Sequence, residues 1–143
     1  MPKDIILIAA VTVDGFIARH TQEITSWSED LHLFQAQTMG SPIIMGSNTH
    51  STLSAALEGR KAIVIHRNDD PQTILSSIQD ERCFVIGGGK TYFRFYPYIT
   101  HIYVTPHPYI FGKGVPLFDG TPEEISLAFQ DLVIVNDKRG IYQ

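Results

Sequence analysis

An acidic residue, Asp30, lies on the apolar side of a predicted helix, where a carboxylate suggests a binding or catalytic role. Residues 28–50 read SEDLHLFQAQTMGSPIIMGSNTH, and the first half of this stretch has the pattern of a helix. Asp30 follows Trp27 by three residues and precedes Phe34 by four, so on a helix it shares their apolar stripe. An unpaired buried carboxylate is costly, and such groups gather where a ligand or a proton transfer compensates. Asp30 is therefore a candidate for a ligand-binding acid or, alternatively, a first-turn acid that favours the helix dipole.

Two strand-to-helix turns are candidate sites for an anion. Met45-Gly46-Ser47-Asn48-Thr49 follows one apolar run, and Gly87-Gly88-Gly89-Lys90 follows another. Helix N-termini have free N–H groups, and ligands of parallel sheets lie at the carboxyl ends of strands. The second turn is not a Walker A loop, because Phe84 occupies the position that requires the first glycine. Together the turns favour a long phosphate-bearing ligand, although each alone is compatible with a tight turn for close helix–strand packing.

The elements that must position these residues alternate along the chain. Strands and helices in alternation predict an α/β domain with a mostly parallel sheet. A polar turn at 136–140 between two short strands predicts an antiparallel C-terminal edge. Ser26 and Glu29 match a capping box and predict a helix that starts at 27. The predicted strands are 5–13, 42–46, 61–66, 83–88, 101–106 and 131–135, and the predicted helices are 27–39, about 49–57, 71–79 and 89–96.

Composition narrows the function classes. The 143 residues suit one domain, 1–143, and a net charge of −4 makes a nucleic-acid partner unfavourable. The single cysteine, Cys83, excludes a disulfide within the chain and is typical of a cytoplasmic protein. The first apolar run is too short to cross a membrane and has no signal-peptide flanks, so no membrane partner is expected. The six histidines lack metal-ligand spacing, so no metal is predicted.

The order and spacing of several motifs resemble the dihydrofolate reductase family. The resemblance covers most of residues 5–118. It implies a dihydrofolate-reductase-like three-layer sandwich, with a mostly parallel central sheet and an antiparallel C-terminal edge. The matching motifs are Ile8-Ala9-Ala10, Asp14-Gly15-Phe16-Ile17, Asp30 to Phe34, Thr38, Pro42 to Gly46, Thr49, Gly59-Arg60-Lys61, Ile86 to Lys90, Tyr92 and Thr105.

The resemblance implies a substrate site centred on Asp30. In the family this acid binds the amidine-like edge of the pterin and promotes protonation of N5, while NADPH passes a hydride to C6. Thr105 resembles a threonine that supports the acid, and Trp27 resembles a tryptophan of the active-site loop. Arg60 resembles the arginine that pairs with the α-carboxylate of the folate glutamate; otherwise it is a solvated arginine. Leu31, Phe34, Leu53, Leu57 and Ile86 resemble substrate-binding positions, or else pack in the core.

The resemblance also implies a site for NADPH. Ser47 stands where the family usually has a basic residue, so His66, Arg67 and Lys90 would supply charge for the 2′-phosphate; NADH is the alternative cofactor. The family holds the peptide bond between Gly87 and Gly88 in cis. The implied cofactor positions are Ala10, Ile17, Gly46, Ser47, Thr49, His66, Arg67, Gly87, Gly88, Gly89, Lys90 and Tyr92.

A second resemblance leaves the substrate open. The stretches 13–18 and 111–118 are more similar to the reductase domain of riboflavin biosynthesis, which shares the fold and the NADPH chemistry. The resemblance to the dihydrofolate reductase family covers more of the chain, so it implies an NADPH-dependent reductase of dihydrofolate. The alternatives are a reductase of a ribosylamino-pyrimidine and a non-catalytic nucleotide-binding relative. Many dihydrofolate reductases are monomers and riboflavin-type relatives often dimerise, so the chain is predicted to be a monomer or a homodimer.

Overall fold

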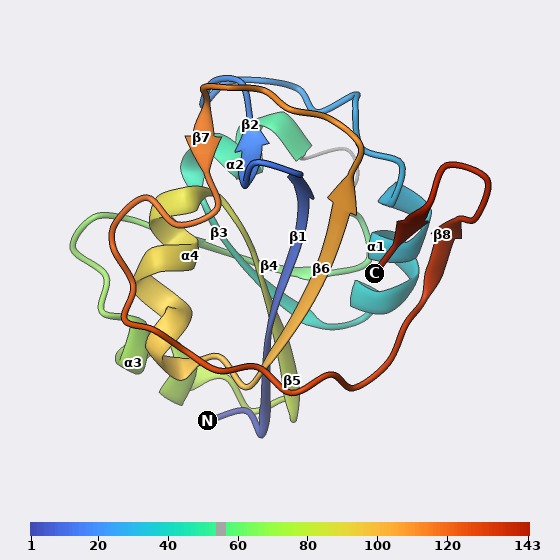
Figure 1. Ribbon diagram of the computed structural model, residues 1–143. Helices are drawn as coiled ribbons and strands as arrows, with labels where there is room; N and C mark the ends of the chain where they lie inside the picture. The colour runs from blue at the N-terminus through green and yellow to red at the C-terminus, as the bar shows by residue number, and fades with distance from the viewer. Residues whose placement is uncertain (54–56) are drawn as a thin grey trace.

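Five parallel strands run through the centre of the computed structural model, which describes residues 1–53 and 57–143. The strand order is β4-β3-β5-β1-β6, so β1 lies between β5 and the edge strand β6, and β4 forms the other edge (Figure 1). This architecture confirms the predicted α/β class and parallel sheet. The central strands are β1 (Asp4–Thr12), β3 (Pro42–Gly46), β4 (Lys61–Ile65), β5 (Arg82–Gly87) and β6 (His101–His107).

Helices cover both faces of the sheet and make three layers. Alternation along β1 sends Ile5 and Leu7 to a core cluster with α3 and α4, and Ile6 and Ile8 to a cluster with α1 and α2. Both faces are buried, which explains why the strands read as continuous apolar runs. The helices are α1 (Leu31–Thr38), α2 (Ser47–Leu53), α3 (Pro71–Ser77), α4 (Gly89–Phe95) and the 3-10 turn η2 (Tyr96–Tyr98).

Two small antiparallel sheets complete the fold. β2 (Phe16–Ala18) pairs with β7 (Val115–Pro116), and β8 (Ile134–Asn136) pairs with β9 (Ile141–Tyr142). The predicted antiparallel C-terminal pair is confirmed, as a separate sheet that lies against β6. Its first strand starts at Ile134, so the predicted range 131–135 was too early. No helix within residues 1–53 and 57–143 is long and apolar enough to cross a membrane.

The predicted start of the first helix was wrong. α1 begins at Leu31, and Asp30 is its N-cap, so the capping box at Ser26 does not form. The Glu29 carboxylate instead pairs with Arg139 at 2.7 Å and accepts a hydrogen bond from the Asn136 side-chain amide at 2.9 Å. A tertiary contact with the C-terminal turn has thus displaced the local motif.

The second helix also has different bounds. α2 runs Ser47–Leu53 and so starts two residues before the predicted 49–57. Positions 54–56 of that prediction lie outside the described residues, and Leu57 is not helical. The third helix does start as its sequence suggests, because Asp70 caps it by accepting the Thr73 N–H at 3.0 Å with Pro71 in the first turn.

Candidate active site

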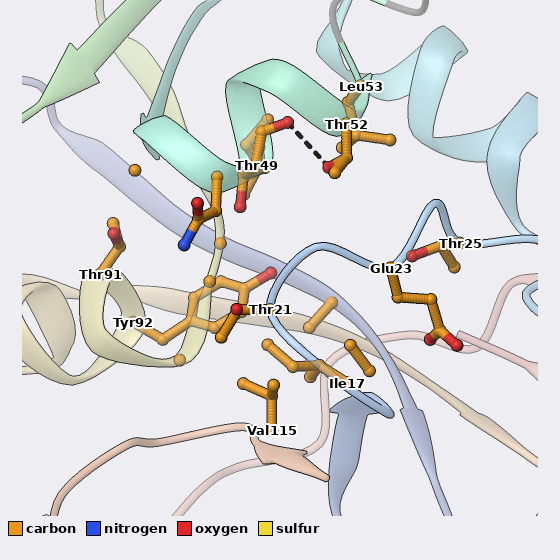
Figure 2. A pocket seen from close by; sticks show the side chains of 18 of the residues that line it. Ile17, Thr21, Glu23, Thr25, Thr49, Thr52, Leu53, Thr91, Tyr92 and Val115 are labelled. Atoms are coloured by element: carbon orange, nitrogen blue, oxygen red, sulfur yellow. Dashed lines mark hydrogen bonds between the residues drawn. The ribbon is translucent and has the colours of Figure 1, made fainter.

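A cavity of about 710 Å³ opens over the carboxyl ends of the parallel strands. Figure 2 shows Thr49 and Thr52 of α2 at the top, Tyr92 of α4 at the left, and Glu23 and Thr25 of the segment before α1 at the right. Ile17 and Val115, from the β2–β7 pair, close the bottom of this view. The cavity is large enough for two connected ligands, as a cofactor and a substrate require.

Most of the predicted site residues line this one cavity. Three lie outside its lining: Leu57, Arg60 and Thr105. The predicted residues that line it are Ala10, Ile17, Trp27, Asp30, Leu31, Phe34, Gly46, Ser47, Thr49, Leu53, His66, Arg67, Ile86, Gly87, Gly88, Gly89, Lys90 and Tyr92.

Asp30 is a buried acid that faces a cavity. Its side chain makes no capping hydrogen bond at the start of α1 within the described chain, and the residue is 8% exposed. Burial raises the pKa of its carboxyl, while the nearby His107 ring and the hydroxyls of Thr105 and Ser28 act in the opposite direction. The acid is therefore available to a ligand and retains its proton more readily than an exposed aspartate.

Two buried polar groups near this acid lack partners. The Trp27 indole N–H and the Thr105 hydroxyl find no hydrogen-bond partner within residues 1–53 and 57–143. The Thr105 hydroxyl lies near the Asp30 carboxyl and the Trp27 indole N–H lies near the Glu23 carboxylate, in both cases without meeting hydrogen-bond geometry. Unpaired buried polar groups are costly, and Trp27 and Asp30 both line the cavity. This end of the cavity is suited to a heterocycle with polar edges.

Glycines bring backbone close to the other end of the cavity. The peptide bond between Gly87 and Gly88 is cis, as the family resemblance predicted. A Cβ on Gly89 would lie 2.6 Å from the carbonyl oxygen of Pro116, so only glycine fits where α4 meets β7. Behind the turn, the Tyr92 hydroxyl donates to the Ile8 carbonyl at 2.6 Å, and burial raises the pKa of this phenol. The turn is thereby fixed against the central strand.

Exposed basic groups stand at the rim of the same end. His66, Arg67 and Lys90 are exposed and line the cavity, while Ser47 contributes no charge. The turn after β4 is held in place by Arg94, whose guanidinium donates to the His66 carbonyl at 3.0 Å and to the Asp69 carbonyl. This donor set suits a phosphorylated ligand.

Arg60 is half-buried beside α1 and uses only part of its guanidinium for the protein. It donates to the Thr38 hydroxyl at 3.1 Å and to the carbonyls of Gln35 and Glu58. Three of its five N–H groups are engaged with described residues. These bonds fix the plane of the guanidinium, and its role toward a carboxylate stays a prediction.

The residues that resemble the riboflavin-pathway reductase have a structural role. The Asp14 carboxylate accepts hydrogen bonds from the Thr12 hydroxyl at 2.6 Å and from the Gly112 N–H at 2.8 Å. The Thr12 hydrogen bond is the largest of the effects that lower the pKa of Asp14. A Cβ on Gly114 would lie 2.2 Å from the Ala18 carbonyl oxygen. These contacts hold the segment before β7 against the turn before β2 and the end of β2.

Sequence reasoning missed part of the site. Residues of the segment 20–25 line the cavity, and the Gln22 amide reaches across to donate to the Asn48 side chain at 2.5 Å. This segment has no periodic pattern, so nothing in the sequence pointed to it. His107 was counted only among scattered histidines, although its spacing of two from Thr105 in a strand places both side chains on one face.

The fold and site define an α/β protein with a large ligand cavity over a parallel sheet, a buried acid at one end and a glycine-rich, basic rim at the other. The family model described as dihydrofolate reductase matches residues 4–108. The chain belongs to the dihydrofolate reductase family.

Individual relatives agree with this placement. The chain is 35% identical over 104 residues to dihydrofolate reductase of Bacillus subtilis (strain 168), covering 63% of this chain and 62% of that enzyme. The alignment thus spans less than two thirds of the Bacillus enzyme. The chain is 30% identical over 140 residues to dihydrofolate reductase type 3 of Salmonella typhimurium, covering 88% and 83% of the two chains.

A solved structure shows the same fold. Dihydrofolate reductase from Enterococcus faecalis, complexed with NADP(H) and RAB-propyl, superimposes with a TM-score of 0.71. The match covers 99% of this chain and 93% of that chain at 18% sequence identity. At this identity the likeness shows the architecture, including the three-layer sandwich predicted from the sequence.

Proposed function

We propose that this protein reduces 7,8-dihydrofolate to tetrahydrofolate with NADPH. The observation that carries the proposal is the Asp30 carboxyl, which is buried at the wall of the large cavity and has a raised pKa. Among described residues, this acid uses no side-chain hydrogen bond to cap its helix and so is free to bind a heterocycle. Membership of the dihydrofolate reductase family supports a pterin as that heterocycle.

The acid end of the cavity would hold the pterin. The carboxyl of Asp30 would bind its amidine-like edge, and the unpaired Trp27 indole N–H offers a further donor nearby. Leu31, Phe34, Leu53 and Ile86 give the apolar walls. A carboxyl group removed from water binds a protonated heterocycle more strongly than a solvated carboxyl group does. Asp30 would thereby promote protonation of the substrate at N5.

The glycine-rich end fits NADPH by its donor chemistry. When bound there, the cofactor would supply the hydride that reduces C6 of the substrate. Thr49 and the Gly87 to Gly89 turn would hold the pyrophosphate, while His66, Arg67 and Lys90 would bind the 2′-phosphate in place of the missing charge at Ser47. Ala10, Ile17 and Tyr92 would surround the nicotinamide. The added hydride and the proton at N5 together complete the reduction.

Arg60 would select the folate tail. Its guanidinium is oriented by Thr38, Gln35 and Glu58, so N–H groups that remain can form a planar pair with a carboxylate. The glutamate of folate carries such a carboxylate, and a ribosylamino-pyrimidine has no such tail.

The predictions of a cytoplasmic location and of a monomer or homodimer are retained as parts of this proposal.

The test is an assay of NADPH oxidation followed by absorbance. Dihydrofolate and a ribosylamino-pyrimidine are offered separately, and NADH replaces NADPH in a parallel series. We expect turnover with dihydrofolate and NADPH, and its loss in the Asp30→Asn variant. Turnover of the pyrimidine but not of dihydrofolate would show that the substrate is the pyrimidine. Tight binding of NADPH without turnover of either compound would indicate a non-catalytic relative.

A further inference from the structure

A buried histidine lies next to the acid and does not line the cavity. His107 is the last residue of β6 and is 1% exposed. Its Nε2 accepts the backbone N–H of Glu29 at 2.9 Å, and its Nδ1 lies 2.9 Å from the carbonyl oxygen of Thr105. The ring therefore connects the strand that carries Thr105 with the residue that immediately precedes Asp30.

These two contacts define the tautomer of the ring. An Nε2 that accepts an N–H carries no proton, so the proton of a neutral imidazole lies on Nδ1 and donates to the Thr105 carbonyl. Both nitrogens are then satisfied without a positive charge. Protonation of Nε2 would turn the acceptor into a donor and remove the bond to Glu29.

The anchor at Glu29 matters because the start of α1 lacks the usual one. An aspartate at an N-cap normally bonds an N–H of the first helical turn, yet within the described chain the Asp30 carboxyl does not. The chain just before it is held instead by the His107 bond to the Glu29 N–H and by the Arg139 and Asn136 bonds to the Glu29 side chain. Asp30 can therefore leave its carboxyl facing the cavity.

The same ring also supports the second polar group of the site. Trp27 packs edge-on against His107, with ring centroids 5.2 Å apart and an interplanar angle of 85°. Tyr109 and Phe111 surround the indole from the segment after β6, at centroid distances of 6.3 and 5.3 Å. His107 thus contacts both the indole that lines the cavity and the backbone that carries the acid.

We propose that His107 is a positioning residue for the reaction: by accepting the Glu29 N–H and packing against Trp27, it holds Asp30 and the indole toward the substrate. This inference rests on the proposed function and deepens it. The ring touches neither ligand, so its loss should act on turnover through Asp30. The cofactor end, built from α2, α4 and the turn after β4, is independent of it.

The experiment compares three variants. His107→Leu fills the space without hydrogen bonds, and His107→Gln keeps an acceptor for the Glu29 N–H but does not titrate. His101→Leu is the matched control, because His101 begins the same strand at the opposite end. We expect kcat with dihydrofolate to fall about 10- to 100-fold in His107→Leu, the size of a misplaced catalytic group. His107→Gln should recover most of kcat, His101→Leu should keep it, and the dissociation constant of NADPH should not change in any of them.

A loss of kcat without a loss of NADPH affinity, together with a substrate-free measurement, distinguishes positioning from packing. Nitrogen NMR of the free protein should show His107 protonated on Nδ1 alone, with a Glu29 amide resonance that moves in His107→Leu. A protonated Nε2 at neutral pH would overturn the proposal whatever the substrate is, and absence of any dihydrofolate turnover would instead count against the proposed function.

Kinetic outcomes can also overturn the proposal. Normal kcat in a folded His107→Leu protein would do so, as would equal losses of kcat and NADPH affinity. If the leucine variant does not fold, His107→Gln decides: a Glu29 amide that loses its hydrogen bond while kcat stays normal would refute the role.

Discussion

The two ends of the cavity use charge in opposite ways. At the acid end, Asp30 is 8% exposed and its neighbours Trp27, Thr105 and His107 are equally buried or more so. At the cofactor end, His66, Arg67 and Lys90 are exposed to solvent. Burial raises the pKa of the acid and prepares it for proton chemistry, whereas solvated cations attract a phosphate at little desolvation cost. This difference supports the proposal that the acid end carries the reaction and that the basic rim binds a phosphate.

The largest effect should come from the buried acid. Asp30→Asn keeps the shape and removes the ionisable group, so turnover at neutral pH should fall by about 10²–10⁴-fold. Some activity should return at lower pH, where more substrate arrives already protonated. Steady-state kinetics across pH measure this. Near-normal turnover with an unchanged pH profile would show that Asp30 does not take part in the reaction.

The same variant carries a signature in stability. A raised pKa means that the folded protein binds the Asp30 proton more tightly than the unfolded chain does. The Asp30 carboxyl therefore lowers stability as the pH rises above 3.8, the ordinary pKa of an aspartate. Asp30→Asn should therefore gain thermal stability relative to wild type at pH 7, and the gain should shrink toward acid pH. Thermal unfolding at several pH values measures the difference, and an equal change at every pH would contradict burial as the cause.

Arg60 tests recognition at the acid end. Arg60→Leu should raise the Michaelis constant for dihydrofolate about 10- to 100-fold, which corresponds to losing hydrogen bonds to a charged group. A pterin without the glutamate tail is the matched substrate and should respond far less. Because Arg60 also bonds Gln35 and Thr38, some stability will be lost as well. Equal effects on both substrates would make Arg60 a structural residue.

Arg67 tests recognition at the solvated end. Arg67→Ala should weaken NADPH binding about tenfold and leave NADH binding nearly unchanged, because only NADPH carries the 2′-phosphate. Arg82→Ala is the control, since Arg82 is exposed at the amino end of β5 beside Asp4. Binding titrations at low and physiological salt measure this, with the smaller loss at higher salt. Equal losses for both cofactors would refute the assignment.

The smallest effect is expected from the ion pair behind the acid. Glu29 and Arg139 side chains are 30% and 44% exposed, so Arg139→Ala should lower the free energy of unfolding by less than about 1 kcal/mol. The comparable exposed pair of Lys61 and Asp80 provides a control in Lys61→Ala. Chemical denaturation measures both. A much larger loss at Arg139 would mean that the C-terminal turn holds the acid end together more firmly than its exposure suggests.

The sequence by itself determined the sheet, most of its helices and the glycine turns. Short continuous apolar runs rich in β-branched residues are typical of strands covered on both faces, so β1, β3 and β5 were predicted closely. Asp70 with Pro71 marked the start of α3 because capping is local chemistry. The motif around Asp30 likewise pointed to the family and to the cavity that the acid faces, since spacing carries over from one relative to another.

Tertiary structure alone decided how the acid is held. Ser26 and Glu29 match a capping box in sequence, yet the helix starts at Leu31, and the Glu29 carboxylate binds Arg139 and Asn136, more than a hundred residues later. Only the pairing of β1 with β6 brings His107 under Trp27 and Glu29. Such contacts join residues far apart in the chain, and their free energies depend on burial and orientation that no local pattern encodes.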